Sequence, residues 1–196
     1  MAASVVAICN MALDMLAAKP IASLTDGSTT ANLCQRNYEP ARDETLRSYP
    51  WNDAMARVSL AASATAPAWG PTYAYPLPAD CLRVVVTEDD ALYGVAWRVE
   101  GREIVCDEAG PLNIRYIRQL TDPSLIGPLL ARVIAARLAA AIAYGLTGDA
   151  RVTQGMSQAA EVAMRDARRM DALEQSSDDS LIADTWTGAR YLPYGI

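Results

Sequence analysis

The sequence predicts an α+β fold, mainly α, in which an antiparallel β-meander is inserted into a four-helix bundle that continues into an extended C-terminal tail. Apolar residues recur every three or four positions near both ends of the chain, whereas apolar and polar residues alternate in the middle. After residue 175 the helical spacing stops, although aromatic residues continue. We therefore expect a helical bundle over 1–71 and 120–175, a β-module over 72–119 and a C-terminal tail over 176–196.

The first helix is expected over 4–18. Its apolar residues form one stripe, and Asn10 and Asp14 fall together on the opposite face. Lys19-Pro20 ends the helix, because the residue before a proline is pushed out of the helical region of backbone space.

The second helix is expected from a Ser28 or Thr29 cap to about Tyr49. Pro40 lies inside it and removes one backbone hydrogen bond, so we expect a kink at that point. One stripe runs along this helix and is widened by Leu33 and Leu46; its residues are Ala31, Cys34, Tyr38, Ala41 and Thr45.

The middle of the chain has the alternation that is typical of strands. Short turns around Gly101 and Gly110 separate neighbouring segments, and such short links predict an antiparallel meander. Before the meander, a short helical or strand piece is expected near 53–62. The predicted strands of the meander are 73–75, 82–87, 95–99, 103–106 and 112–118.

Two further helices follow the meander. Gly127-Pro128 is a helix start, with proline at the first helical position, and this helix runs to about Gly145. A tight connection leads to the last helix, over about 151–174. The apolar stretch 125–146 carries Arg132 and Arg137, so no membrane span is expected. The first residues, 1–4, lack a charged segment, so no secretory signal is expected.

The composition excludes several classes of function. The net charge is −6, which argues against a general nucleic-acid binder. The chain has no histidine, which removes Ser-His-Asp, Cys-His and histidine–metal chemistry. Its four cysteines form no CxxC pair and are expected to be buried free thiols. We therefore expect no enzyme, no cofactor and no metal site.

Several segments resemble, in order and spacing, the head-to-tail adaptor family of short-tailed phages, also called tail tubular protein A. The resemblance covers about 1–174. The matching segments are AICNMAL at 7–13, KPIASL at 19–24, ANLCQRNYEPARDETLR at 31–47, YPW at 49–51, YPLPADCLRV at 75–84, DPSL at 122–125, AARLA at 135–139 and LTGD at 146–149.

The resemblance implies a structural virion protein without a catalytic step. Such a protein forms a homo-oligomeric, usually dodecameric, ring between the portal protein and the tail nozzle protein. DNA passes through the lumen without specific binding, and no membrane is involved. The protein would be made in the host cytoplasm and located in the neck of the phage tail. The family's β-module typically faces the tail, so we expect Trp97, Arg98, Glu100 and Arg102 at that contact.

The tail matches no segment of the family, but its composition suggests a docking element. A polar linker at 175–180 is followed by apolar and aromatic residues without helical spacing. The family's C-terminal extension typically grips the portal. The tail therefore binds the portal or a neighbouring subunit, or it folds back on its own bundle. The residues expected to bind are Leu181, Ile182, Trp186, Tyr191 and Tyr194.

A different class of function remains open on the sequence alone. The chain could be a cytoplasmic helical protein-binding module with no role in a virion, holding a peptide or protein in a groove of the bundle. Such a module is a stable monomer or dimer, and its tail can be removed without loss of binding. A hydrolase that uses loop carboxylates is disfavoured, because every acidic pair falls in a predicted turn or linker.

Overall fold

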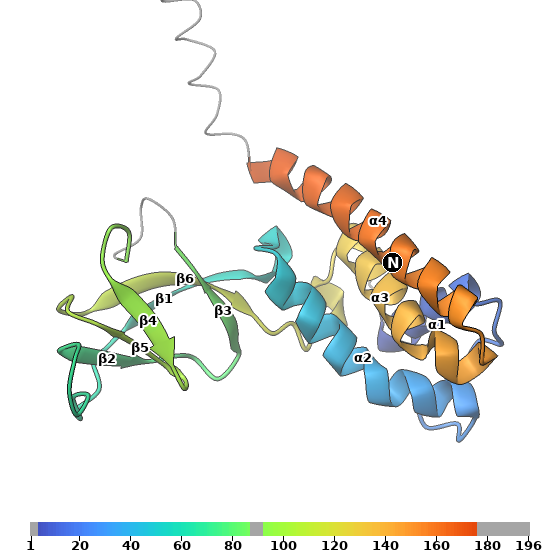
Figure 1. The fold of residues 1–196 in the computed structure, drawn as a ribbon, viewed down its shortest axis with the longest axis horizontal. Coiled ribbons are helices and arrows are strands. Elements are labelled where there is room, and N and C mark those ends of the chain that lie inside the picture. Colours follow the sequence, from blue (N-terminus) through green and yellow to red (C-terminus); the bar gives the residue numbers. More distant parts are fainter. Residues whose placement is uncertain (1–3, 87–91, 176–196) are drawn as a thin grey trace, which may run out of the picture.

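The computed structural model describes residues 4–86 and 92–175, which fold into four α-helices and two small antiparallel sheets. The helices lie on one side and the sheets on the other, with α2 next to the sheets (Figure 1). The helical elements, two of them single 3₁₀ turns, are α1 (Val5–Met15), α2 (Thr29–Ser48), η1 (Asn52–Ala54), η2 (Pro123–Leu125), α3 (Pro128–Thr147) and α4 (Ala150–Gln175). The strands are β1 (Met55–Leu60), β2 (Tyr73–Pro76), β3 (Cys81–Val85), β4 (Trp97–Glu100), β5 (Glu103–Cys106) and β6 (Leu112–Arg118).

The two N-terminal helices begin at serine caps. The Ser4 hydroxyl accepts the backbone N–H of Ala7 at 3.1 Å, and the Ser28 hydroxyl accepts that of Ala31 at 3.2 Å. Of the two caps considered for the second helix, the serine is therefore used. Helix α2 continues through Pro40, which lies on its exposed side.

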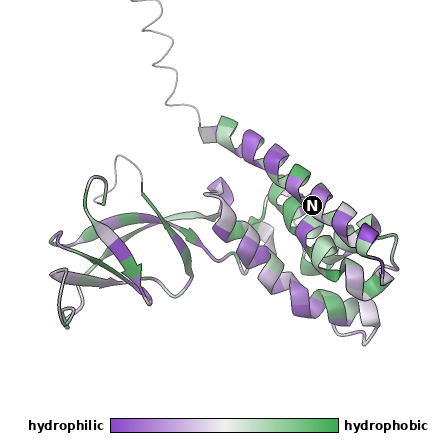
Figure 2. Cartoon of the chain, viewed as in Figure 1, coloured by the Kyte–Doolittle hydropathy of each residue, from purple (hydrophilic) through white to green (hydrophobic). Residues whose placement is uncertain are grey.

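Helix α3 is the centre of the helical part. It packs against α1, α2 and α4, and its buried residues lie on several faces rather than in one stripe. Figure 2 shows the contrast between hydrophobic α3 and the more hydrophilic α2 and α4. By length and composition α3 could cross a membrane, a property that the buried core helices of globular proteins share. Gly148, with φ 65°, ends α3 in the left-handed conformation that glycine adopts most readily.

The expected meander is wrong, although the strands are antiparallel and close to the predicted ranges. One sheet has the order β1-β6-β3 and the other β2-β5-β4, so only β4 and β5 pair as neighbours in sequence. Side chains from both sheets, among them Tyr75, Ile104 and Ile114, share one small core. Pairing distant strands gives each sheet an apolar face that the other covers, which a single exposed meander would not provide.

The first sheet lies between two hydrophobic cores. In β6, Leu112 and Ile114 join the core between the sheets, whereas Ile117 joins the core of the helices. In β3, Val84 packs against the core between the sheets, and Leu82 packs against the core of the helices. The helices, the first sheet and the second sheet therefore form successive layers.

The expected start of the β-module at residue 72 is too late. Strand β1 lies within the range assigned to the helical bundle, yet it pairs with β6 along its whole length, from Met55 opposite Ile117 to Leu60 opposite Leu112. The chain therefore enters and leaves the β-module through two paired strands. The expected tail, over 176–196, lies outside the described residues.

Candidate functional site

The four β-module residues expected to face the phage tail do not form one surface: three lie on β4 and Arg102 lies in the turn after it. Side chains alternate along a strand, so Trp97 points to one side and Arg98 and Glu100 to the other. Arg98 and Glu100 form an exposed ion pair with each other. Trp97 and Arg102 line a cleft that runs toward α2. The structure therefore brings together two pairs of the predicted residues and does not bring the four into one site.

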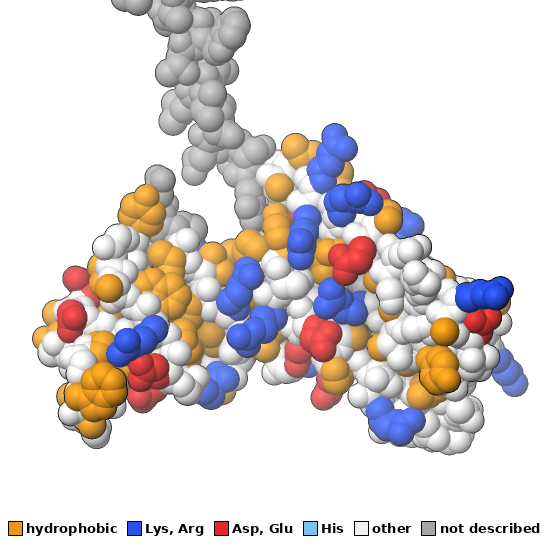
Figure 3. Space-filling view, in the orientation of Figure 1, with side chains coloured by type: hydrophobic (Ala, Val, Ile, Leu, Met, Phe, Trp, Pro, Cys, Tyr) orange, Lys and Arg blue, Asp and Glu red, His pale blue; other side chains and the backbone are white. Residues whose placement is uncertain are grey.

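The cleft beside Trp97 and Arg102 is lined by arginines from three elements. Arg47 comes from the last turn of α2, Arg83 from β3 and Arg102 from the turn after β4, around a cavity of about 220 Å³. We call these three residues and Trp97 the arginine cleft. Figure 3 shows Lys and Arg side chains gathered over the part of the molecule where the helices meet the β-module. Sequence reasoning did not single out Arg47 and Arg83, because no spacing in the chain links them to the turn.

Backbone carbonyl groups hold two of the three guanidinium groups. Arg47 Nη1 donates to the carbonyl oxygen of Leu82 at 3.1 Å, and Arg102 Nη2 donates to the carbonyl oxygens of Pro78 and Ala79. Within residues 4–86 and 92–175, no ion pair joins these arginines to a carboxylate. Their positive charge is therefore not neutralised inside the described part of the chain.

Arg83 lies between other positive charges. Partial burial lowers the pKa of its guanidinium group, and the nearby charges of Arg47 and Arg168 lower it further. An anion that binds beside a desolvated guanidinium group surrounded by like charges stabilises its charged form. The cleft is therefore suited to a carboxylate or phosphate group, which guanidinium groups bind through paired hydrogen bonds.

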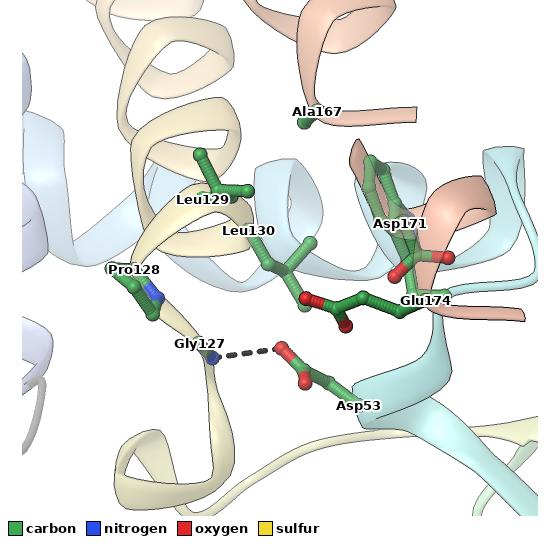
Figure 4. A pocket seen from close by; sticks show the side chains of 9 residues that line it. Asp53, Gly127, Pro128, Leu129, Leu130, Ala167, Asp171 and Glu174 are labelled. Atoms are coloured by element: carbon green, nitrogen blue, oxygen red, sulfur yellow. Dashed lines mark hydrogen bonds between the residues drawn. The ribbon is translucent and has the colours of Figure 1, made fainter. Parts of the chain in front are cut away.

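A second, acidic pocket lies where the start of α3 meets the end of α4. Carboxyl groups of Asp53, Asp171 and Glu174 face a cavity of about 130 Å³ whose other wall includes Leu129 and Leu130 (Figure 4). We call it the acidic pocket. Asp53 Oδ2 accepts the backbone N–H of Gly127 at 2.8 Å, so the negative charge lies at the N-terminus of α3, where the helix dipole favours it.

Asp171 is the most perturbed group of the acidic pocket. Its Oδ1 accepts the backbone N–H of Asn52 at 3.2 Å, whereas its buried Oδ2 has no hydrogen-bond partner in the structure. Burial raises the pKa of this carboxyl group, the Asn52 hydrogen bond lowers it, and the charges of Asp53 and Glu174 raise it again. The three carboxyl groups therefore repel one another, and a cationic side chain bound in the pocket would reduce this repulsion.

The described residues show no metal centre and no disulfide bond. Among them, no group of three or more metal-ligating side chains is placed to hold an ion. Cys9, Cys34, Cys81 and Cys106 are all buried and free, as expected. Cys9 and Cys34 face each other from α1 and α2, and a hydrogen bond between them raises the pKa of the Cys9 thiol, which burial raises further.

The tail residues expected to bind lie outside the described residues, and comparisons with known proteins add no assignment. Leu181, Ile182, Trp186, Tyr191 and Tyr194 belong to the segment after α4. No protein-family model matches the chain, and no curated protein matches it either. The class that the geometry defines is thus an α+β protein with a basic cleft and an acidic pocket.

Proposed function

We propose that this protein is a structural head-to-tail adaptor of a phage virion. Copies of the chain form a ring, of dodecameric type, between the portal protein and the tail nozzle protein, and DNA passes through its lumen. The protein has no catalytic step in this role, and it is located in the neck of the virion after synthesis in the host cytoplasm. The net charge of −6 suits a channel along which DNA must move without being held.

The observation that carries the proposal is the ordered set of segments that resemble the adaptor family. The structure supports it by giving those segments definite roles in the fold. Asn10, in the first segment, makes two hydrogen bonds to the backbone of Ile21, in the second. Trp51, in the YPW segment, is buried and donates through Nε1 to the carbonyl oxygen of Thr45 at 2.9 Å. The matching residues therefore specify how the helices are joined.

The finer architecture belongs to the same proposal. The four helices form one bundle, with α3 at its centre, and residues 176–196 extend from it as a docking tail. Contacts of α3 with α1, α2 and α4 support the bundle, and the Ala-rich faces of α3 and α4 allow close packing. In the ring, the tail binds the portal or the neighbouring subunit through Trp186 and the tyrosines that follow it.

The arginine cleft is the surface proposed for the tail nozzle. Trp97 supplies an aromatic anchor, and Arg47, Arg83 and Arg102 supply positive charge for an acidic group of the nozzle. Arg98 and Glu100, which neutralise each other on the other face of β4, lie at the rim of this contact.

Electron microscopy of the full chain mixed with the portal protein of the same phage tests the ring. The proposal predicts portal rings that carry an added layer of this protein. Without the portal protein, the chain is expected to stay as free subunits that form no ring. A chain that never joins the portal ring, with its tail intact, contradicts the proposal.

Portal binding by the C-terminal tail, residues 176–196, has its own test. Deleting 176–196 is expected to leave the fold intact and to weaken portal binding, and Trp186→Ala is expected to reproduce much of the loss, about 2 kcal/mol for a buried aromatic anchor. Portal binding that is unchanged by both variants would exclude the docking role while leaving the ring itself open to the previous test.

A cytoplasmic helical protein-binding module is the second candidate, and one observation favours it. A groove of about 300 Å³ with mostly apolar walls remains open between α3 and α4. Such a groove is the kind of surface that binds an amphipathic or extended peptide. A monomer or dimer that binds such a peptide and ignores the portal distinguishes this candidate from the ring.

A further inference from the structure

An apolar groove between α3 and α4 has no covering element among the described residues. Leu129 and Val133 line it from α3, and Val162 and Ala163 from α4. Leu129 and Val162 are 44% and 45% exposed, although both point toward the partner helix across the groove. The α4 side of the groove is also lined by the small side chains of Ala159 and Ala167. Exposed aliphatic side chains that line a concavity mark a docking surface rather than scattered surface residues.

The groove is continuous with the end of α4. The same face of that helix continues to Met170 and Leu173, which are 48% and 61% exposed. Leu129 and Ala167 line both the groove and the acidic pocket, so the two cavities adjoin. The surface therefore begins as an apolar groove and ends in a group of three carboxylates close to the last turn of α4.

The segment that follows α4 has the matching chemistry. It carries Trp186 as a large apolar side chain and Arg190 as a cation four residues later. We propose that the segment 181–196 of this chain docks in the groove between α3 and α4 of the same molecule. In this arrangement Trp186 fills the groove against Leu129 and Val162, and Arg190 reaches the acidic pocket.

The length of chain permits this occupant. The far end of the groove, at Ala159, lies about 24 Å from Gln175 along α4 at 1.5 Å per residue. Residues 176–185 span up to about 33 Å when extended at roughly 3.3 Å per residue, enough to return along that distance. A tether of this length gives the segment an effective concentration in the millimolar range, which favours the same molecule over a second copy.

Charge supports the same placement. The linker sequence carries Asp178 and Asp179, and α4, along which it would return, has exposed Arg165 and Arg169 side chains of opposite charge. Arg190 in turn relieves the acidic pocket, where Asp171 has a buried oxygen without a hydrogen-bond partner. The inference does not rest on the ring proposal, because it concerns the free subunit and requires no portal.

A photoreactive amino acid in place of Trp186 tests the inference on the full chain. The benzophenone side chain is aromatic and of similar size, and irradiation links it to whatever lies beside it. We expect cross-links to the groove residues around Leu129 and Val162, in a product of monomer size whose yield does not depend on protein concentration. Cross-links to the β-module, or scattered over the surface, contradict the docking site.

A pair of charge variants makes the result specific. Val162→Glu is expected to reduce the monomeric cross-link to less than half, because it places a carboxylate in the apolar groove. Ser157→Glu adds the same charge to another exposed face of α4 and is expected to leave the yield unchanged. Circular dichroism checks that both variants remain folded. Equal yields from the two variants would overturn the proposal.

Two further outcomes are decisive. Arg190→Glu is expected to lower the cross-linking yield and Arg190→Lys to retain it, because the acidic pocket holds a cation at this position. Equal yields from these two variants contradict the contact of Arg190 with the acidic pocket. A dimer-sized product whose yield rises with protein concentration identifies a second copy as the occupant and overturns docking within one molecule. The portal is absent from the assay, so its result is separate from the test of the ring.

Discussion

The side-chain amide of Asn10 makes both of its hydrogen bonds with the backbone of a single residue, Ile21. Its Nδ2 donates to the carbonyl oxygen of Ile21 at 3.0 Å, and its Oδ1 accepts the Ile21 N–H at 2.8 Å. This pair fixes the connector after α1 against the face of the helix opposite the apolar stripe. The connection between α1 and α2 therefore depends on one amide.

Asn10→Ala is expected to lower the free energy of unfolding by about 1–3 kcal/mol, because two partly buried backbone groups lose their partner. Asn10→Asp keeps the acceptor but places a carboxylate against a carbonyl oxygen, so it is also expected to destabilise the fold. Urea unfolding measures both. Asp14→Ala, at an exposed position on α1, is the control and is expected to change stability by less than about 0.5 kcal/mol. A neutral Asn10→Ala would show that the connector is held by other contacts.

Trp51 is expected to stabilise the fold through both its hydrogen bond and its buried ring. It is 2% exposed, donates to Thr45 and packs edge-on against Tyr49, with ring centroids 4.9 Å apart. Trp51→Phe removes the donor and part of the buried ring system, and we expect a loss of about 1–3 kcal/mol. Trp51→Ala is expected to cost about 3–5 kcal/mol through the cavity that it leaves. Denaturant unfolding checks both values.

Trp69 provides the matched control for this series. It is 82% exposed, so Trp69→Phe is expected to change the free energy of unfolding by less than about 0.5 kcal/mol. Similar losses at the two tryptophans would contradict the role assigned to the buried ring.

Asp171 is expected to make stability depend on pH. Its pKa is raised in the folded protein, chiefly by burial, above the ordinary value of 3.8. The folded state then binds the proton more tightly than the unfolded chain, so stability falls as pH rises from 3.8 through the folded pKa and stays lower above it.

Asp171→Asn keeps an acceptor for the Asn52 N–H and removes the charge. The stability of this variant relative to the native protein is expected to increase with pH through that window and then to level off. Asp171→Ala, which also loses the acceptor, is expected to be less stable than Asp171→Asn at every pH. Urea midpoints measured from pH 3 to pH 8 test this, and parallel curves for native and Asn proteins would refute it.

The arginine cleft predicts opposite effects for two neighbouring arginines. Arg83→Gln removes a charge that lies near Arg47 and Arg168, so stability is expected to stay equal or rise slightly. Arg102→Gln loses the hydrogen bonds to Pro78 and Ala79 and is expected to lose roughly 0.5–1 kcal/mol. Thermal unfolding compares the two. Both variants are expected to weaken binding of the nozzle protein, whereas Arg98→Gln, on the other face of β4, is expected to affect it less.

The sequence predicted the helices and the strand positions well, because each depends on local spacing and local caps. The second helix ends at Ser48, close to the predicted Tyr49, since the YPW segment interrupts it. The pairing of the strands could not be predicted in this way. Strand β6 pairs with β1 and β3, which are far from it in sequence, and it contributes Leu112 to one core and Ile117 to the other.

The candidate site shows the same limit. Helical spacing placed Asn10 on the face opposite the apolar stripe, but it could not show that the connector packs over that face and hydrogen-bonds the amide. Trp97 and Arg98 are adjacent in the chain and were expected in one contact, yet strand alternation separates them. Arg47 joins the cleft only through the packing of α2 against β3. Local pattern specifies the elements, and their packing determines which side chains meet.

The pairing of β1 with β6 has a consequence for how such a protein could have diversified. Met55, at the start of β1, lies opposite Ile117, near the end of β6. The chain therefore leaves the helices and returns to them on two adjacent, paired strands. The second sheet, β2-β5-β4, lies between Leu60 and Leu112 in the chain and could be shortened, enlarged or exchanged, provided that β3, whose Leu82 packs into the helical core, is kept. A lineage could thereby adapt one end of the molecule to a new partner while the other end kept its old one.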